Sequence, residues 1–376
     1  MHSTIEVNAA VFTGPNEPLE VRKLTISAEP GPHEVLVKLA ASGVCHSDLH
    51  VLDGDWGSPA PMVLGHEGAG VIVAVGAEVH DLAVDDHVIL SWTPSCQRCE
   101  FCVSGHPVLC QLANETAYQH VFFDGKPRLS DGEIDVKSFL AVGSFGDHAM
   151  VPASAAIKIR KDAPLAQAAL VGCAVTTGIG AVINTAKVEP GSTVLVVGCG
   201  GVGLNVVQGA KLAGAKQIIV ADVSAEKLAL GQQFGATHTV NSRERDLLEA
   251  VRELTGGRGV DYAFEAIGLP FTIEACYEAI RRGGTAVVVG QVADGVKISI
   301  DPFVMSDQEK KLIGSNYGSS RQSIDFPNII DLYMEGKVDL DSMITDRITL
   351  DGVNAAFEQM RRGSGIRTVI EYGAGK

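Results

Sequence analysis

The sequence predicts a mixed α/β protein in which a doubly wound parallel sheet follows a β-rich region. From about residue 190, apolar strand-like runs alternate with longer helical patterns, as in parallel sheets whose two faces are both covered by helices. Before residue 170, glycine, proline and short β-type runs come at close intervals, which is typical of an irregular β domain. A chain of 376 residues is long enough for two or three such domains.

The expected elements follow from where apolar residues gather and where turn residues interrupt them. In the β-rich region, strands are predicted at 34–39 and 70–75. Strands of the parallel sheet are predicted at 193–197, 217–221, 237–240, 260–264 and 285–289. Helices are predicted over 202–213, from 224 onward, and over 243–254, 271–282 and 324–334. Residues 367–372 predict a closing strand.

Composition and charge limit the classes of function. Apolar residues make up 46% and charged residues 20%, which indicates an ordered globular protein. The net charge of −15 disfavours nucleic acid and anionic membranes as partners. We see no leader peptide and no apolar run of roughly 18 residues that would cross a bilayer, so we expect a cytoplasmic protein. In that reducing compartment, clustered cysteines suggest metal ligands before disulfides.

A glycine-rich turn follows the predicted strand at 193–197. The segment Gly198-Cys-Gly-Gly-Val-Gly203 matches G-x-G-x-x-G between a buried strand and a helix, which is the context that pyrophosphate binding requires. The next strand ends at Asp222, whose carboxylate can accept both ribose hydroxyls of NAD and repel the extra phosphate of NADP. The alternative is a plain glycine-rich turn with an unrelated aspartate downstream.

Two sets of cysteine and histidine residues suggest metal sites. Cys96, Cys99, Cys102 and Cys110 form C-x2-C-x2-C-x7-C in one loop. Four thiolates would occupy all four coordination positions of a tetrahedral ion, which favours a structural Zn²⁺. Disulfides, free thiols or an iron–sulfur cluster are the alternatives. Cys45, His66 and Cys173 could hold a second zinc with one position open. Their spacing alone does not separate a zinc site from buried core residues.

Taken together, these motifs resemble the zinc-containing medium-chain alcohol dehydrogenases over essentially the whole chain. Gly65-His66-Glu67-x2-Gly70-x5-Gly76 is similar to that family's zinc signature, and the other motifs follow in the family's order. The resemblance implies a Rossmann NAD-binding domain at 176–316, inserted in a GroES-like catalytic domain formed by 1–175 and 317–376. The long loop between Cys110 and Cys173 is similar to the usually dimeric branch, which implies a homodimer, with a homotetramer as the alternative.

The resemblance also implies roles for individual residues. Cys45, His66 and Cys173 would hold the catalytic zinc, with Glu67 behind the metal and Asp48 fixing the ring of His66. Ser47 and His50 would carry the substrate proton towards solvent. The expected NAD contacts are His46, Thr177, Gly198, Gly200, Gly201, Val202, Gly203, Asp222, Lys227, Gly268, Gly290, Val292 and Arg367. Without the resemblance, several of these residues would suit a turn, a helix cap or an exposed surface equally well.

The expected function is reversible, NAD-dependent oxidation of a small alcohol to an aldehyde or ketone, with two Zn²⁺ ions per chain. The expected pocket residues Trp56, Trp92 and Phe139 favour primary alcohols with an apolar or aromatic chain. One alternative is oxidation of the formaldehyde adduct of glutathione or mycothiol. The branch of the family that acts on the glutathione adduct typically has Asp and Arg where this chain has Trp56 and Asn114. A second alternative is a zinc protein that binds NAD without catalysis.

Overall fold

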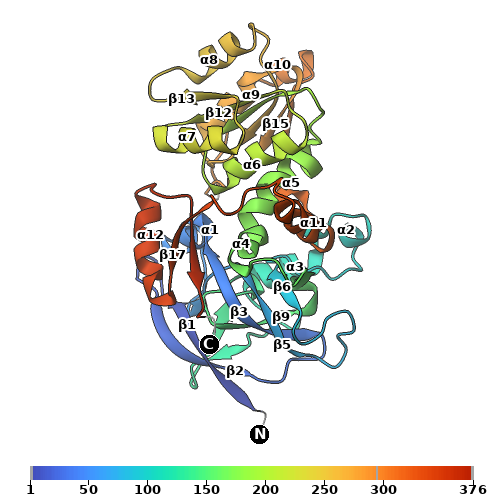
Figure 1. Ribbon diagram of the computed structural model, residues 1–376, viewed down its shortest axis with the longest axis vertical. Helices are drawn as coiled ribbons and strands as arrows, with labels where there is room; N and C mark the ends of the chain where they lie inside the picture. The colour runs from blue at the N-terminus through green and yellow to red at the C-terminus, as the bar shows by residue number, and fades with distance from the viewer. Residues whose placement is uncertain (1–2, 294, 374–376) are drawn as a thin grey trace. The chain divides into compact units, whose positions relative to one another are not determined.

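The computed structural model describes residues 3–293 and 295–373 and divides into two compact units. The β-rich unit consists of Met1–Cys173 and Arg321–Lys376, and the parallel-sheet unit consists of Ala174–Ser320. Figure 1 shows the β-rich unit mainly in blue, cyan and red, and the parallel-sheet unit in green to orange. These divisions lie close to the expected boundaries at 175 and 317.

The parallel-sheet unit contains a six-stranded sheet in the order β13-β12-β11-β14-β15-β16, with every neighbouring pair parallel. Its strands are β11 (Thr193–Val197), β12 (Gln217–Asp222), β13 (His238–Asn241), β14 (Val260–Glu265), β15 (Ile280–Val288) and β16 (Lys311–Gly314). The strand order reverses at β11, which lies between β12 and β14. In doubly wound sheets the ligand crevice forms outside the carboxyl ends of the strands at such a reversal. The predicted doubly wound sheet is therefore confirmed, and β16 is a strand that the sequence analysis missed.

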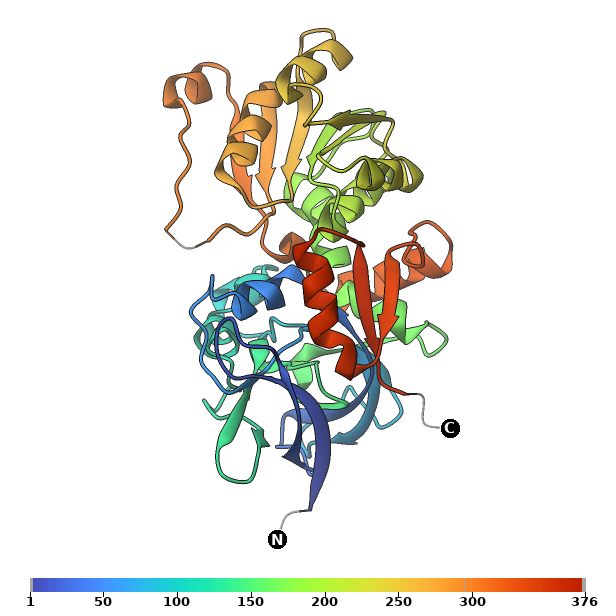
Figure 2. The same cartoon turned by 90° about the vertical axis from the view of Figure 1, so that its left-hand side faces the viewer.

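Helices cover both faces of this sheet (Figure 2). The helices of this unit are α5 (Thr176–Gly180), α6 (Gly201–Leu212), α7 (Ala225–Phe234), α8 (Leu247–Leu254), α9 (Pro270–Ala279) and α10 (Pro302–Asp307). The helix predicted over 243–254 begins only at Leu247, because the Asp246 side chain caps it by accepting a hydrogen bond from Glu249 N. The helix predicted over 271–282 ends at Ala279, because β15 begins at the next residue.

The β-rich unit contains a closed barrel, β1-β2-β7-β8-β4, and a sheet in the order β10-β6-β5-β3-β18-β17 with β9 also paired to β3. The barrel strands are β1 (Thr4–Phe12), β2 (Glu20–Ser27), β4 (Met62–Val63), β7 (Leu129–Ser130) and β8 (Asp135–Ser138). The sheet strands are β3 (Glu34–Val44), β5 (Glu67–Val75), β6 (His87–Leu90), β9 (His148–Pro152), β10 (Ala156–Ile159), β17 (Ile344–Ile348) and β18 (Arg367–Glu371). β18 returns from the chain's end to pair with β3, with Thr368 opposite Val44. This pairing brings Arg367 to the end of β3.

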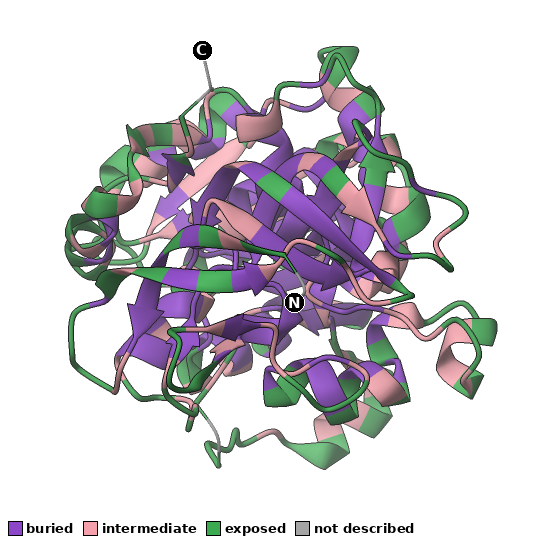
Figure 3. Cartoon of the chain, turned by 90° about the horizontal axis from the view of Figure 1, so that it is seen from below, coloured by how far each residue is buried: buried purple, intermediate pink, exposed green. Residues whose placement is uncertain are grey.

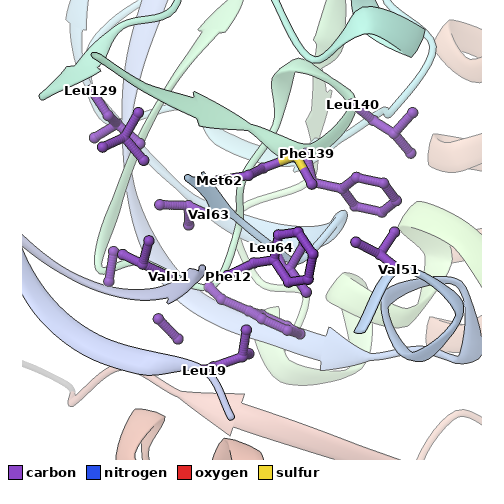
Figure 4. Close-up of a cluster of buried hydrophobic side chains, with 14 of the residues drawn as sticks. Val11, Phe12, Leu19, Val51, Met62, Val63, Leu64, Leu129, Phe139 and Leu140 are labelled. Carbon is purple, nitrogen blue, oxygen red and sulfur yellow. The ribbon is translucent and has the colours of Figure 1, made fainter. Parts of the chain in front are cut away.

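Helices of 4 to 13 residues connect these strands. They are α1 (His46–Leu52), α2 (Glu100–Val103), α3 (Gln111–Thr116), α4 (Leu165–Leu170), α11 (Gln322–Met334) and α12 (Val353–Arg361). Seen from below, the strands of the β-rich unit are largely buried, and exposed residues gather in the turns and outer helices (Figure 3). Val11 and Phe12 of β1, Met62 and Val63 of β4, and Phe139 belong to one buried cluster (Figure 4). Burial of such side chains contributes roughly 1.5–3 kcal/mol each, so the apolar core fixes the position of Phe139.

A continuous helical run over Leu165–Ala186 is long and apolar enough to cross a membrane by length and composition. It is 83% buried inside the protein, as is usual for the core helix of a globular protein. The run alternates α-helical turns with π-helical turns at Val171–Val175 and Ala181–Ala186. Such π-turns are rare and frequently occur at functional sites.

Candidate active site

Four metal-ligating side chains meet in the β-rich unit. The ligand atoms of Cys45, His66, Glu67 and Cys173 all lie within 4.8 Å of one another, and all four residues are buried. Strand pairing explains part of this convergence. Cys45 directly follows β3, His66 directly precedes β5, and Gly43 of β3 pairs with Glu67 of β5. Cys173 lies in the first π-helical turn of the long helical run.

Asp48 fixes the orientation of the His66 ring. Its Oδ1 atom lies 3.2 Å from His66 Nδ1 and accepts a hydrogen bond of 2.9 Å from Gly65 N. A ring that donates from Nδ1 presents the lone pair of Nε2 to a metal. Among the described residues, the buried Nε2 atom has no hydrogen-bond partner. Two thiols and this unpaired nitrogen fit a zinc ion with one open position.

Glu67 has a charged neighbour of its own. Arg367 Nη1 lies 3.6 Å from Glu67 Oε1 and donates a hydrogen bond of 3.2 Å to the carbonyl oxygen of Val44. Both side chains are almost completely buried. Burial raises the pKa of Glu67 to about 7, and Arg367 opposes that shift. Arg367, expected at the NAD pyrophosphate, thus lies against Glu67 at the metal cluster.

The two thiols of the cluster shift each other's pKa in opposite directions. A hydrogen bond with Cys173 lowers the pKa of Cys45 well below its usual value, and the same contact raises the pKa of Cys173. Of the two thiols, Cys45 therefore gives up its proton more readily. Because a metal takes thiolates as ligands, zinc uptake at this cluster releases protons.

The second cluster contains the four cysteines of the predicted structural loop. The sulfur atoms of Cys96, Cys99, Cys102 and Cys110 also lie within 4.8 Å of one another. None of the eight cysteines forms a disulfide. Hydrogen bonds from backbone N–H groups, Cys102 first, lower the pKa of Cys99 to about 6. Four sulfurs that converge in this way fit a closed, structural zinc site.

The glycine-rich turn lies where its proposed chemistry requires. It connects β11 to α6, and β11 is the strand at which the sheet order reverses. A Cβ atom on Gly203 would lie 1.8 Å from Gly198 O, so the turn closes tightly, whereas a Cβ atom on Gly200 would meet nothing within 4 Å. The open space beside Gly200 fits the close approach of a pyrophosphate to the backbone.

Asp222 lies beside this turn. Its carboxylate oxygens accept hydrogen bonds of 2.8 Å from Cys199 N and 2.9 Å from Ser224 N. Lys227 is half-buried in the first turn of α7. The remaining expected NAD contacts of this unit lie in α5, at the start of α6, and in the loops after β14 and β15, and these are Thr177, Gly201, Val202, Gly268, Gly290 and Val292.

Of the expected relay and pocket residues, Ser47 and Phe139 lie beside residues of the metal cluster. Ser47 Oγ lies 3.8 Å from Cys45 Sγ, while His46 is exposed at the start of α1. His50 Nδ1 lies 2.7 Å from Asp55 Oδ2. Each expected pocket residue has a ring contact. The Trp56 ring is 4.9 Å from that of His50, Phe139 meets His66 edge-on at 5.5 Å, and Trp92 meets Tyr118 at 6.2 Å.

His120 is a residue near this site that the sequence analysis missed. Its ring lies 5.4 Å from the ring of Phe139, and its Nδ1 accepts a hydrogen bond of 3.3 Å from Leu140 N. Burial lowers the pKa of His120 to about 4, with a further contribution from Lys137. His120 is thus neutral and supports Phe139 behind His66. A lone histidine in a loop gives no sequence signal for this role.

The lowered pKa of His120 predicts an acid-sensitive fold. Between the unfolded pKa of about 6.5 and the folded pKa of about 4, the unfolded chain binds one proton more, so the free energy of unfolding falls as the pH falls. The contribution of His120 to the free energy of unfolding is fully present above pH 6.5. Lowering the pH to 4 removes about 3 kcal/mol of it. Denaturant unfolding of wild type and His120→Gln across this range checks it. An equal pH slope in both proteins contradicts the prediction.

Comparison with known proteins agrees with this geometry. The family description "Alcohol dehydrogenase GroES-like domain" matches residues 31–161, and "Zinc-binding dehydrogenase" matches residues 201–335. The S-(hydroxymethyl)glutathione dehydrogenase of Paracoccus denitrificans is 38% identical to this chain, covering 98% of it and 100% of the relative. The chain belongs to the zinc-containing medium-chain alcohol dehydrogenases.

Two further relatives are similar to this dehydrogenase over nearly its whole length. The alcohol dehydrogenase class-3 of Cereibacter sphaeroides is 39% identical, covering 98% of this chain and 100% of the relative. The crystal structure of benzyl alcohol dehydrogenase from Acinetobacter calcoaceticus is 34% identical with a TM-score of 0.93, covering 98% and 100% of the two chains. Membership in the family confirms an NAD- and zinc-using alcohol oxidoreductase with a Rossmann-type and a GroES-like domain.

Proposed function

We propose that this alcohol dehydrogenase oxidises the S-hydroxymethyl adduct of a thiol, with glutathione as the first candidate. The curated relatives described above support this choice, because the one from Paracoccus denitrificans carries that activity in its name. The adduct is itself a primary alcohol, so it needs no chemistry beyond that of the family. The proposal reverses the order of preference in the sequence analysis, where apolar or aromatic alcohols came first.

The observation that carries the dehydrogenase chemistry is the convergence of metal donors in the buried cluster. Cys45, His66 and Cys173 supply three donors, and Glu67 is held by Arg367. When bound there, zinc supplies a Lewis acid that lowers the pKa of a substrate hydroxyl group, while NAD accepts the hydride. In the proposal, Asp48 keeps Nε2 of His66 available for the metal. Phe139 packs against the His66 ring and helps to exclude water.

The substrate proton needs a path away from this buried cluster. We assign Ser47 Oγ, beside Cys45, as the first acceptor, and His50, which is partly exposed, as the group that passes the proton to solvent. Asp55 accepts from His50 Nδ1 and leaves Nε2 of that ring as the proton acceptor. When bound, NAD would supply a ribose hydroxyl to complete the relay between Ser47 and His50.

We assign NAD to the parallel-sheet unit. The Gly198–Gly203 turn would hold the pyrophosphate, and the Asp222 carboxylate would accept the ribose hydroxyls. Lys227, Thr177, Gly268, Gly290 and Val292 are proposed as further contacts, together with His46 and Arg367 from the β-rich unit. A homodimer and a cytoplasmic location also remain predictions.

A second candidate substrate class is the aromatic or apolar primary alcohol. Two observations favour it. Trp56 and Phe139 place aromatic rings beside His50 and His66, and aromatic walls suit apolar chains. In addition, the similar crystal structure is named for benzyl alcohol. A protein that binds zinc and NAD without turning over a substrate is the least supported alternative, because the chain retains the metal donors, Ser47 and His50 together.

A substrate panel followed by NADH absorbance tests the proposal. We expect formaldehyde to be oxidised at least about tenfold faster with glutathione present than without it, since binding contacts to the thiol part add to kcat/KM. Mycothiol, benzyl alcohol and ethanol form the other arms. A Trp56→Asp variant is a matched probe, because it restores the acidic residue of the glutathione-dependent branch.

Each outcome separates the candidates. Turnover of formaldehyde that requires a thiol supports the proposal and identifies the thiol. Turnover of benzyl alcohol with no effect of either thiol contradicts the proposal and favours the second candidate. No turnover on any substrate by protein that carries zinc and binds NADH supports the non-catalytic alternative.

A further inference from the structure

Glu265 is a buried carboxyl group to which the sequence analysis assigned no role. It is the last residue of β14 and is completely buried. β14 pairs with β11 so that Glu265 lies opposite Val197, the residue before the glycine-rich turn. Glu265 therefore lies at the carboxyl end of the sheet and at the reversal of strand order, where doubly wound sheets bind their ligands.

One oxygen of Glu265 organises the loop after β14. Oε1 accepts three hydrogen bonds, from Ile267 N at 3.0 Å, Gly268 N at 2.8 Å and Thr272 Oγ1 at 2.7 Å. The first two fix the backbone of the loop, and the third ties it to the first turn of α9. Three donors on one buried oxygen indicate a loop that is held in a single conformation.

The main chain of Glu265 holds the loop after β15. Its carbonyl oxygen accepts hydrogen bonds of 2.9 Å from both Val289 N and Gly290 N. The two loops touch at their glycines: a Cβ atom on Gly290 would lie 2.3 Å from Gly268 N and 2.6 Å from Glu265 Oε2. Oε2 is buried and has no hydrogen-bond partner among the described residues. Glu265 therefore connects the two loops that carry Gly268, Gly290 and Val292.

We propose that Glu265 is a positioning residue that preorganises the two loops for NAD without touching it. The inference rests on the proposed function, in which Gly268, Gly290 and Val292 contact the cofactor. A ligand that binds backbone groups gains affinity when those groups are already fixed. The entropy cost of ordering them then does not reduce the binding free energy. Burying a carboxyl group at the end of a strand costs free energy, so a role in holding the two loops accounts for its presence there.

The test compares NADH affinity in the zinc-loaded, full-length protein by calorimetry. We expect Glu265→Ala to weaken NADH binding at least about tenfold, because the loop after β14 loses all three of its acceptor contacts. Glu265→Gln should stay within about threefold of wild type, since its carbonyl oxygen can accept the same three bonds. In steady-state kinetics, KM for NAD should rise in Glu265→Ala while kcat at saturating NAD and KM for the alcohol stay close to wild type.

Asp261→Ala is the matched control. Asp261 is a second carboxylate of β14, partly buried, but it lies near the start of the strand and contacts Thr193 N and Arg281. Its loss should lower the melting temperature without changing the NADH affinity more than about twofold. Thr272→Val, which removes only the hydroxyl donor, gives a milder variant that folds if Glu265→Ala does not, with an expected two- to fivefold loss of affinity.

The outcomes separate this inference from the proposed function. If Glu265→Ala and Thr272→Val bind NADH as tightly as wild type, or if Asp261→Ala weakens binding equally, the inference is wrong while the proposed function stands. If the wild-type protein does not bind NADH at all, the proposed function itself fails.

Discussion

A His66→Ala variant is expected to lose alcohol oxidation by at least about 10³-fold in kcat, because metal Lewis-acid stabilisation is worth several kcal/mol. The ring of His66 is the only nitrogen donor in the buried cluster, and Asp48 holds it in place. Its loss leaves two thiols and the Glu67–Arg367 pair. We expect one of the two zinc ions of each chain to be lost as well. Turnover with NAD and zinc quantification per chain are the measurements.

The matched control for this variant is His148→Ala. His148 also lies in the β-rich unit and also holds an aspartate through Nδ1, at 2.9 Å from Asp147 Oδ1, but it is not part of a metal cluster. Its removal should leave two zinc ions per chain and full activity. Should His66→Ala retain both ions and most of its activity, the buried cluster is not the catalytic centre.

Much of the parallel-sheet unit could be predicted from sequence because its signals are local. The strand predicted at 193–197 coincides with β11, and the predicted strands at 217–221 and 260–264 each differ from β12 and β14 by a single residue. Continuous apolar runs bounded by turns mark strands that are buried on both faces. Only the edge strand β16, which is short and polar at Lys311, gave no such signal.

The β-rich unit was less predictable because its pairings are long-range. Nothing in the local pattern at 367–372 says that this strand pairs with β3, more than 300 residues earlier. That pairing is what brings Arg367 to Glu67. The π-helical turns around Cys173 were also missed, since they depend on packing within the long helical run and not on residue periodicity.

The candidate site, too, could be predicted only in part from the sequence. The ligand types and the order of the motifs indicated two zinc sites, but spacing alone did not separate the set of Cys45, His66 and Cys173 from ordinary buried residues. The structure adds the reason why the set is suited to a metal, which is the unpaired Nε2 atom of His66 among buried thiols. The supporting residues His120 and Glu265 have no motif at all. They are recognisable only from burial and hydrogen bonds.

Replacing Cys102 by serine is expected to remove the zinc of the four-cysteine loop and to leave the catalytic zinc in place. The loop around α2 is largely exposed and is held by sulfur contacts such as the 3.5 Å approach of Cys99 and Cys102. Without the ion, little apolar burial remains to fix this segment. We expect the melting temperature to fall by roughly 10 °C and the loop to become sensitive to proteolysis, since a structural metal contributes directly to folding stability.

Cys276→Ser provides the control for that prediction. Cys276 is a buried cysteine of α9 that lies outside both clusters, so its replacement should cost some packing and keep two zinc ions per chain. Activity of Cys102→Ser at low temperature distinguishes a structural from a catalytic ion. A closed set of four sulfurs leaves no position for substrate, so turnover should persist until the protein unfolds. Immediate loss of turnover with an unchanged melting temperature would mean that the four-cysteine ion takes part in the chemistry.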